Sequence, residues 1–378
     1  MSRIAPFGEN DRLLFSILRT RWKKLGEHES TSSHDPESFT QFVITHGLAG
    51  VLLKYHSKHI EYRLGSTALA KLRTAYITSA HLNRARIAQL SKIAHLFGSA
   101  GIDWVLLKGP GLSARLYGDP NVRISGDVDI LVDRASVDCA ISILQSAGFR
   151  SDQNVPAKRQ IIRRALAFSY THQNVLYSRD GVVVELHWRS NSSPQLSHGS
   201  LSSIIANSSP VMVDKVEVRV LDGVPLLEQI ARHAYSSMWL RWKWLYDVID
   251  TWLYVSHRSP ESAEQLFLTA PAIQTSLTLA SWLMGFDSAE VFPAATGIVR
   301  EPERILRLRD SKIDKEYQDS EAPARTIPAA SLAVERLFFQ MKAHSGWRAQ
   351  CQYLAWRALV PMMSRASSNQ LQGKSTGI

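Results

Sequence analysis

The chain has 378 residues, 45% of them hydrophobic, and a formal net charge of +10. This length is sufficient for two or three small modules with real cores, and no apolar stretch approaches the roughly 20 residues of a membrane-spanning helix. Two cysteines give no basis for a disulfide framework or a cysteine zinc site, and the N-terminus lacks the apolar core of a signal peptide. We therefore expect a cytoplasmic protein. The positive charge favours polyanionic partners, nucleic acid included, although a basic solvated surface would give the same balance.

Residues 1–95 form the first predicted region, which is helical. Apolar residues recur at helical spacing over 11–22 and 37–55. A longer amphipathic helix is predicted over 68–96. Its apolar side comprises Leu72, Ile77, Leu82, Ile87, Leu90 and Ile93. We expect this region to flank the part of the chain in which strands and helices alternate.

The second predicted region, residues 96–222, alternates short strands with helices. Its first apolar strand runs into a glycine-rich turn that begins with Lys108 and Gly109, and 112–117 continues as a helix. Gly109 and Gly111 allow the backbone to approach a bulky anion, and the N–H groups at a helix start favour phosphate. Lys108 and both glycines are therefore candidates for phosphate contact, although Lys108 could also be a solvated charge at a strand end.

The next strand carries two acids. Asp127 and Asp129 are separated by one residue at the start of an apolar run, so a strand sends both carboxylates to one face and the apolar residues between and after them to the other. Two like charges this close cost free energy when they are desolvated. A shared cation relieves this cost, and oxygen ligands favour Mg²⁺ or Mn²⁺. Arg123, four residues before Asp127, could neutralise a phosphate or brace the acids.

A third acid lies on a later strand. An Asp-Gly turn predicts a hairpin between 171–177 and 182–188. On the second of these strands, Glu185 and His187 share one face. Glu185 is a candidate third carboxylate, whereas His187 could orient Glu185, contact substrate or be structural.

Three further elements are predicted in the same region. They are a helix over 136–147, a basic helix over 158–166, and a closing hairpin of 211–213 with 216–221. The basic helix could steer polyanions towards the acids, or it could be an exposed amphipathic surface.

The third predicted region, residues 223–364, is again mainly helical, and 365–378 form a disordered tail. A helix over 226–238 is followed by an aromatic and basic stretch that contains Lys243. Lys243 could contact phosphate, or this stretch could pack against the sheet. Residues 286–330 are expected to be loosely ordered, because proline, alanine and charged residues are mixed there.

Three segments, in this order, carry a resemblance to a known family. They are Leu-Leu-Lys-Gly at 106–109, Arg-x-x-x-Asp-x-Asp-x-Leu-Val at 123–132, and Glu-Leu-His-Trp at 185–188. The pattern resembles the uncharacterised bacterial nucleotidyltransferase family, which belongs to the polymerase-β-like superfamily. The resemblance extends over roughly residues 95–250. Lys-Gly stands here in place of the Gly-Ser of the wider superfamily, as it does in this subfamily.

The resemblance implies an α+β fold, with a small mixed-sheet nucleotidyltransferase core flanked by N- and C-terminal helical regions. It implies transfer of a nucleoside monophosphate from an NTP to a hydroxyl or phosphate acceptor, with release of pyrophosphate and with two Mg²⁺ or Mn²⁺ ions as cofactors. Asp127, Asp129 and Glu185 would be the catalytic and metal-binding acids. Substrate and nucleotide would be bound by Lys108, Gly109, Gly111, Arg123, His187 and Lys243.

The resemblance does not identify the acceptor. Similar proteins suggest a small molecule, a saccharide or a peptide product. A toxin-type nucleotidyltransferase that modifies protein or tRNA would share the fold, and so would a catalytically inactive module that binds nucleotide or nucleic acid. The presence of all three acids argues against the inactive module.

Overall fold

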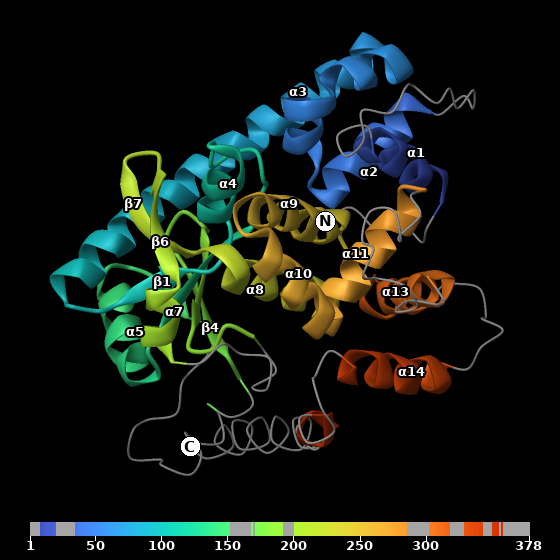
Figure 1. Ribbon diagram of the computed structural model, residues 1–378. Coiled ribbons are helices and arrows are strands. Elements are labelled where there is room, and N and C mark those ends of the chain that lie inside the picture. Colours follow the sequence, from blue (N-terminus) through green and yellow to red (C-terminus); the bar gives the residue numbers. More distant parts are fainter. Residues whose placement is uncertain are drawn as a thin grey trace, which may run out of the picture.

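The computed structural model describes residues 8–19, 35–151, 168, 171–191, 200–285, 302–317, 329–342, 350–354 and 357. Within these residues, seven strands form one mixed sheet, and helices precede and follow it in the chain (Figure 1). This arrangement confirms the predicted α+β class. The predicted boundaries after residues 95 and 222 remain predictions.

The sheet has the strand order β3-β4-β5-β2-β1-β7-β6. Strand β2 pairs antiparallel with β1 and parallel with β5, and β7 pairs parallel with β1. The acid-bearing strand β2 is therefore central and has a neighbour on each side. The strands are β1 (Trp104–Leu106), β2 (Asp127–Val132), β3 (Arg150–Ser151), β4 (Gln173–Tyr177), β5 (Val183–His187), β6 (Ser208–Val213) and β7 (Val216–Leu221).

Both predicted hairpins are present. Strands β4 and β5 pair antiparallel, with the Ser178 N–H donating to the Val182 carbonyl at 2.9 Å across the turn. Strands β6 and β7 pair antiparallel around Asp214, whose φ of 56° lies in the left-handed region that asparagine and aspartate tolerate best among residues with a side chain. The short-range turn signals therefore located these strand pairs correctly.

The two faces of the sheet pack against different helices. On one face, Val128, Ile130 and Val132 are at most 1% exposed and share a hydrophobic cluster with residues of α3 and α5. On the other face, Leu131 joins a separate cluster with residues of α8 and α9. Since Leu131 shares its face with Asp129, the acids lie on the side of the sheet that α8 and α9 cover. The predicted inward-facing apolar positions of β2 are confirmed.

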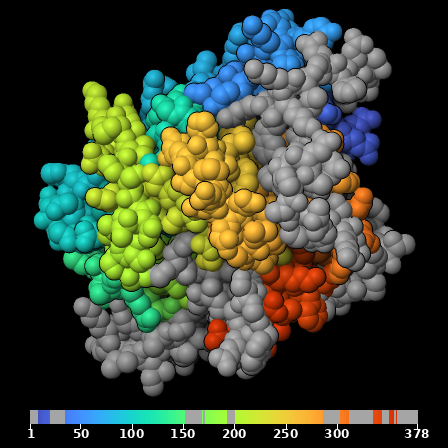
Figure 2. All heavy atoms as spheres, viewed as in Figure 1, coloured from blue at the N-terminus to red at the C-terminus, as the bar shows by residue number. Residues whose placement is uncertain are grey.

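Helices surround this sheet and extend the chain away from it (Figure 1). Figure 2 shows part of the later helices, in gold, lying directly against the yellow-green surface that includes the later strands. The helices are α1 (Glu9–Leu18), α2 (Pro36–His46), α3 (Ala49–Ser99), α4 (Pro110–Tyr117), α5 (Val137–Ser146), α7 (Leu201–Ala206), α8 (Gly223–Ser236), α9 (Trp242–Arg258), α10 (Pro260–Thr269), α11 (Pro271–Leu283), α13 (Pro302–Tyr317) and α14 (Ala329–Met341).

The N-terminal helices are divided differently from the prediction. The stretch 37–55 contains most of α2 and the start of α3, because Gly47 ends α2 with a left-handed φ of 73°. Glycine adopts this conformation at little cost and commonly ends helices. The helix predicted over 68–96 is the later part of α3, which is kinked at Gly65 with φ 83° and ψ 169°.

Two of the predicted inward-facing positions of α3 were wrong. Ile77 and Leu82 are 64% and 57% exposed. The buried positions here are instead Leu72, Asn83 and Ile87. Leu72 and Asn83 are three helical turns apart, and Asn83 and Ile87 are one turn apart. The Asn83 amide donates to the Pro120 carbonyl at 2.9 Å. A polar residue thus occupies an inward position that a search for apolar spacing does not include.

The C-terminal helices contain one further difference. Residues 286–330 were expected to be loosely ordered, yet α13 spans Pro302–Tyr317 within them. The basic helix predicted over 158–166 and the tail over 365–378 lie outside the described residues. Within the described residues, no single helix is long and apolar enough to cross a membrane; α10 and α11 reach that length and apolarity only as a pair bent by 101°.

Candidate functional site

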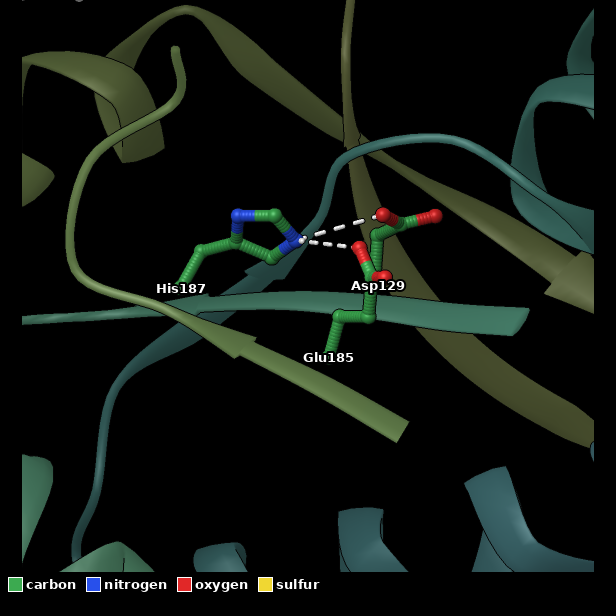
Figure 3. A group of neighbouring side chains, drawn as sticks. All are labelled: Asp129, Glu185 and His187. Atoms are coloured by element: carbon green, nitrogen blue, oxygen red, sulfur yellow. Dashed lines mark hydrogen bonds and ion pairs between the residues drawn. The ribbon is translucent and has the colours of Figure 1, made fainter. Parts of the chain in front are cut away.

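Two neighbouring parallel strands bring the predicted acids together. In the register of β2 and β5, Asp129 lies opposite Glu185, and Leu131 lies opposite His187. Asp127 and Asp129 alternate with buried residues on β2, so their side chains leave the sheet on the same face. Glu185 and His187 do the same on β5. Figure 3 shows the side chains of Asp129, Glu185 and His187 converging from these two strands.

The closest group consists of Asp129, Glu185 and His187. The His187 Nε2 atom lies 3.2 Å from Asp129 Oδ1 and 3.4 Å from Glu185 Oε2 (Figure 3). One ligand atom from each side chain lies within 4.8 Å of the other two. Asp129 is fully buried, and its Oδ2 atom has no hydrogen-bond partner among the described residues. A buried carboxylate oxygen without a donor, beside a second carboxylate and an imidazole, fits a divalent cation.

Asp127 lies beside this group and has a different partner. The Ser125 hydroxyl is 3.1 Å from Asp127 Oδ1 and 2.9 Å from the carbonyl of the same residue. The sequence placed Asp127 among the metal ligands and His187 among the substrate contacts. In the structure, the His187 Nε2 atom lies 3.2 Å from Asp129 Oδ1. The Asp127 carboxylate is half-buried and is hydrogen-bonded to the Ser125 hydroxyl at the start of β2. Ser125 was not predicted, and a serine two residues before an acid gives little signal in a sequence.

Lys108 forms an ion pair within the acid group. Its Nζ atom lies 2.9 Å from Asp129 Oδ1. Burial by itself would lower the pKa of Lys108, but Asp129 and then Asp127 outweigh burial and raise that pKa. Burial by itself would raise the pKa of Asp129, but Lys108 and His187 outweigh it and hold that pKa well below its usual value. Asp129 is therefore a carboxylate and Lys108 an ammonium at neutral pH.

The two glycines of the predicted phosphate turn have different structural roles. Gly109 has a φ of 72°, and a Cβ atom there would lie 3.3 Å from Ser125 Oγ. Gly111 lies in the first turn of α4, where a Cβ atom would be 2.7 Å from side-chain carbons of Leu106 and Val220. Gly109 thus permits a left-handed turn directly beside the acids. The absence of a side chain at Gly111 lets α4 pack closely on the sheet.

Arg123 and Lys243 connect the sheet side to α9. The Arg123 guanidinium donates to both carboxylate oxygens of Asp247 at 2.8 Å, and both side chains are 4% exposed. The Lys243 Nζ atom donates to the Ile124 carbonyl at 3.0 Å. The bidentate pair uses the Nε and Nη2 atoms of Arg123, so contact with a phosphate would fall to the other N–H donors of the guanidinium. The acid that Arg123 does hold belongs to α9 and not to β2.

Helix α8 adds two polar side chains to the same side of the sheet. Gln229 and His233 are four residues apart and so share a face of the helix. The Gln229 amide donates to the Ser190 carbonyl at 2.7 Å, and the His233 ring packs edge-on against Trp244 at 5.3 Å between centroids. Burial, followed by the charge of Lys108, holds the pKa of His233 well below its usual value. Of these two side chains, Gln229 was not assigned to the site from the sequence.

The buried Lys243 leads to a prediction about stability and pH. Burial, and then the neighbouring Arg123 charge, lowers the pKa of Lys243 to about 7, whereas an unfolded lysine has a pKa of about 10.4. Between these values the unfolded chain binds more protons than the folded chain, so this group makes the free energy of unfolding increase with pH. We expect the stability difference between wild type and Lys243→Met to shift in favour of wild type as pH rises.

Urea unfolding at pH 7, 8 and 9 measures this difference. Lys92→Met provides the control, because Lys92 is exposed on α3 and donates to the Ala147 carbonyl. The difference between wild type and Lys92→Met is expected to stay constant over this range. A constant difference for Lys243→Met as well would contradict the shifted pKa.

Comparisons with known proteins give a family match and similar solved structures. Residues 32–292 match the sequence model of a family described as uncharacterised nucleotidyltransferase. One similar solved structure is an antigenic nucleotidyltransferase-like protein from Paracoccidioides brasiliensis, with 21% identity and a TM-score of 0.32 over 55% of this chain and 91% of that chain. No curated protein matches the chain.

Proposed function

Since this chain belongs to the uncharacterised nucleotidyltransferase family, we propose that it is a metal-dependent enzyme that transfers a nucleoside monophosphate from an NTP to an acceptor and releases pyrophosphate. We place it in the polymerase-β-like superfamily, in the bacterial subfamily that carries Lys-Gly in the phosphate turn. The proposed acceptor is a hydroxyl or phosphate group on a small molecule, saccharide or peptide product.

The observation that carries this proposal is the meeting of Asp129, Glu185 and His187 from two neighbouring parallel strands, with their ligand atoms within 4.8 Å of one another. The buried Asp129 Oδ2 atom has no donor among the described residues, and a bound cation would supply the missing partner. Asp127 extends from the same face of β2 and would complete the set of acids.

Asp127, Asp129 and Glu185 would hold Mg²⁺ or Mn²⁺, with His187 as a neighbouring ligand or donor. Such ions, two in the proposed site, stabilise the attacking and leaving oxygens of the transferred phosphoryl group. Protein groups would make the remaining contacts with the substrate. Lys108 would contact the triphosphate, with the backbone of the turn from Gly109 beside it.

Glu185 is the acid best placed to take part in proton transfer. Its side chain is 21% exposed, whereas that of Asp129 is fully buried. An acceptor can therefore approach Glu185 from the solvent side. As the acceptor oxygen bonds to the α-phosphorus and the bond to pyrophosphate breaks, the acceptor proton would pass to the Glu185 carboxylate. His187, whose Nε2 atom lies 3.4 Å from Glu185 Oε2, would help to hold that carboxylate in position.

A direct assay tests the proposed function. The protein is incubated with each of the four labelled NTPs, Mg²⁺ and a cell extract, and both pyrophosphate release and the labelled product are measured. We expect one or more NTPs to give pyrophosphate and a labelled acceptor, and we expect EDTA to stop both. No pyrophosphate with any NTP, or release that EDTA leaves unchanged, would refute the proposal.

A further inference from the structure

We propose that Lys108 is an internal counter-ion of the acid group, which a divalent metal ion must displace from Asp129, and that this displacement frees the Lys108 ammonium for the triphosphate. The inference rests on the proposed function for the identity of the metal and the nucleotide. It predicts that metal and nucleotide assist each other in binding, and that a single lysine provides the coupling.

Lys108 and His187 share one carboxylate oxygen of Asp129. Asp129 Oδ1 lies 2.9 Å from Lys108 Nζ and 3.2 Å from His187 Nε2. Asp127 and Glu185 also act electrostatically on Lys108. Without a metal, the ammonium thus provides positive charge at the place where the acids converge. This explains how a fully buried Asp129 remains ionised.

A metal ion that binds Asp129 and Glu185 would lie next to the Lys108 ammonium. Two cations at this separation repel each other, and the repulsion is stronger in a site partly removed from water than in bulk solvent. The metal must therefore compete with Lys108 for Asp129. Lysine is suited to this exchange, because its compact charge sits on a flexible stem of four carbons.

Lys108 is partly exposed, so its ammonium can move away from Asp129 when a metal ion displaces it. Its side chain is 19% exposed, in contrast to the fully buried Asp129. It also directly precedes Gly109, which turns the chain into the start of α4. A triphosphate bound at this turn would offer the ammonium new anionic oxygens. Since coupling between two ligands is reciprocal, a triphosphate that captures Lys108 would favour the metal as much as the metal favours the triphosphate.

The test measures two affinities that should change in opposite directions. Mn²⁺ binding without nucleotide is followed by electron paramagnetic resonance for wild type, Lys108→Met and Lys92→Met. Lys92→Met is the matched control, because it removes the same charge from an exposed position on α3 whose lysine donates to the Ala147 carbonyl. We expect Lys108→Met to bind free Mn²⁺ at least about tenfold more tightly than wild type, and Lys92→Met to match wild type.

The second affinity is that for a non-hydrolysable NTP analogue at saturating Mn²⁺. Here we expect Lys108→Met to bind at least about tenfold more weakly than wild type, because the ammonium that should meet the triphosphate is missing. A purely structural role for Lys108 would weaken both affinities. Equal or weaker binding of free Mn²⁺ by Lys108→Met overturns the counter-ion, and unchanged binding of the analogue overturns the transfer of Lys108 to the triphosphate.

Two additional variants keep the test decisive. If Lys108→Met does not fold, Lys108→Gln replaces it, and the same outcomes apply. The double variant Lys108→Met/Asp129→Asn is expected to lose the gain in Mn²⁺ affinity, because the gain arises at Asp129. Catalytic turnover is not needed for the Mn²⁺ measurement. A protein that transfers no nucleotide but shows the gain would refute the proposed function and support the counter-ion, and the reverse result would do the opposite.

Discussion

Asp129→Asn is expected to lower the rate of nucleotidyl transfer by at least about 10²–10³-fold, since removal of one positioned electrostatic group commonly has an effect of that size. Asp129 has the most contacts of the proposed acids: Lys108 at 2.9 Å and His187 at 3.2 Å, with Glu185 directly opposite on the neighbouring strand. Asparagine keeps the shape of the side chain but removes its charge. Pyrophosphate release per folded protein measures the effect.

Two comparisons separate lost catalysis from lost stability. Asp129→Asn also leaves the Lys108 ammonium without its nearest anion, so some loss of stability is expected, although Asp127 and Glu185 still act on that ammonium. Asp127→Asn leaves the ion pair of Lys108 and Asp129 in place, so it should reduce transfer with a smaller change in unfolding. Asp103→Asn, at an exposed position just before β1, is the control for charge alone. Wild-type transfer by a folded Asp129→Asn protein would refute the assignment.

The parts of the fold that depend on neighbouring residues could be predicted from the sequence. Alternation along β2 separated Asp127 and Asp129 from the buried apolar face, because strand geometry fixes the side of every second residue. The turn signals located both hairpins for the same local reason. The break at Gly47, inside the stretch 37–55, was missed. A glycine inside an apolar helical pattern is compatible with a continuous helix, a kink or a helix end.

The contacts of the site depend on topology and could not be predicted in the same way. Asp129 meets Glu185 because β5 lies parallel to β2 with that register, and parallel pairing of distant strands leaves no turn signal. The position of Lys108 on Asp129 follows from the antiparallel pairing of β1 and β2, in which the Leu107 N–H donates to the Asp129 carbonyl at 3.0 Å. The sequence motif identified the candidate residues, but the pairing of the strands determines which of them are in contact.

Arg123 shows the same limit and gives the second large effect. Its partner, Asp247, lies 124 residues further along the chain, and no local pattern links the two. We expect Arg123→Met to reduce the free energy of unfolding by about 3–5 kcal/mol, because it leaves the Asp247 carboxylate buried without its bidentate partner. Urea unfolding measures this change. Arg84→Met, at an exposed position on α3, should be close to wild type.

The buried charges that remain after each single substitution make this prediction more specific. Lys243 is also buried and interacts electrostatically with both Arg123 and Asp247. When Arg123 is removed, Lys243 still provides a cation near Asp247. When Asp247 is removed, the Arg123 guanidinium remains buried beside Lys243 without that anion. Asp247→Asn should therefore destabilise the protein more than Arg123→Met, and Arg123→Met/Asp247→Leu should recover much of the loss, because both charges are then gone. Equal losses in the single variants would contradict the compensation by Lys243. A double variant as unstable as the sum of the two would show that Arg123 and Asp247 contribute independently.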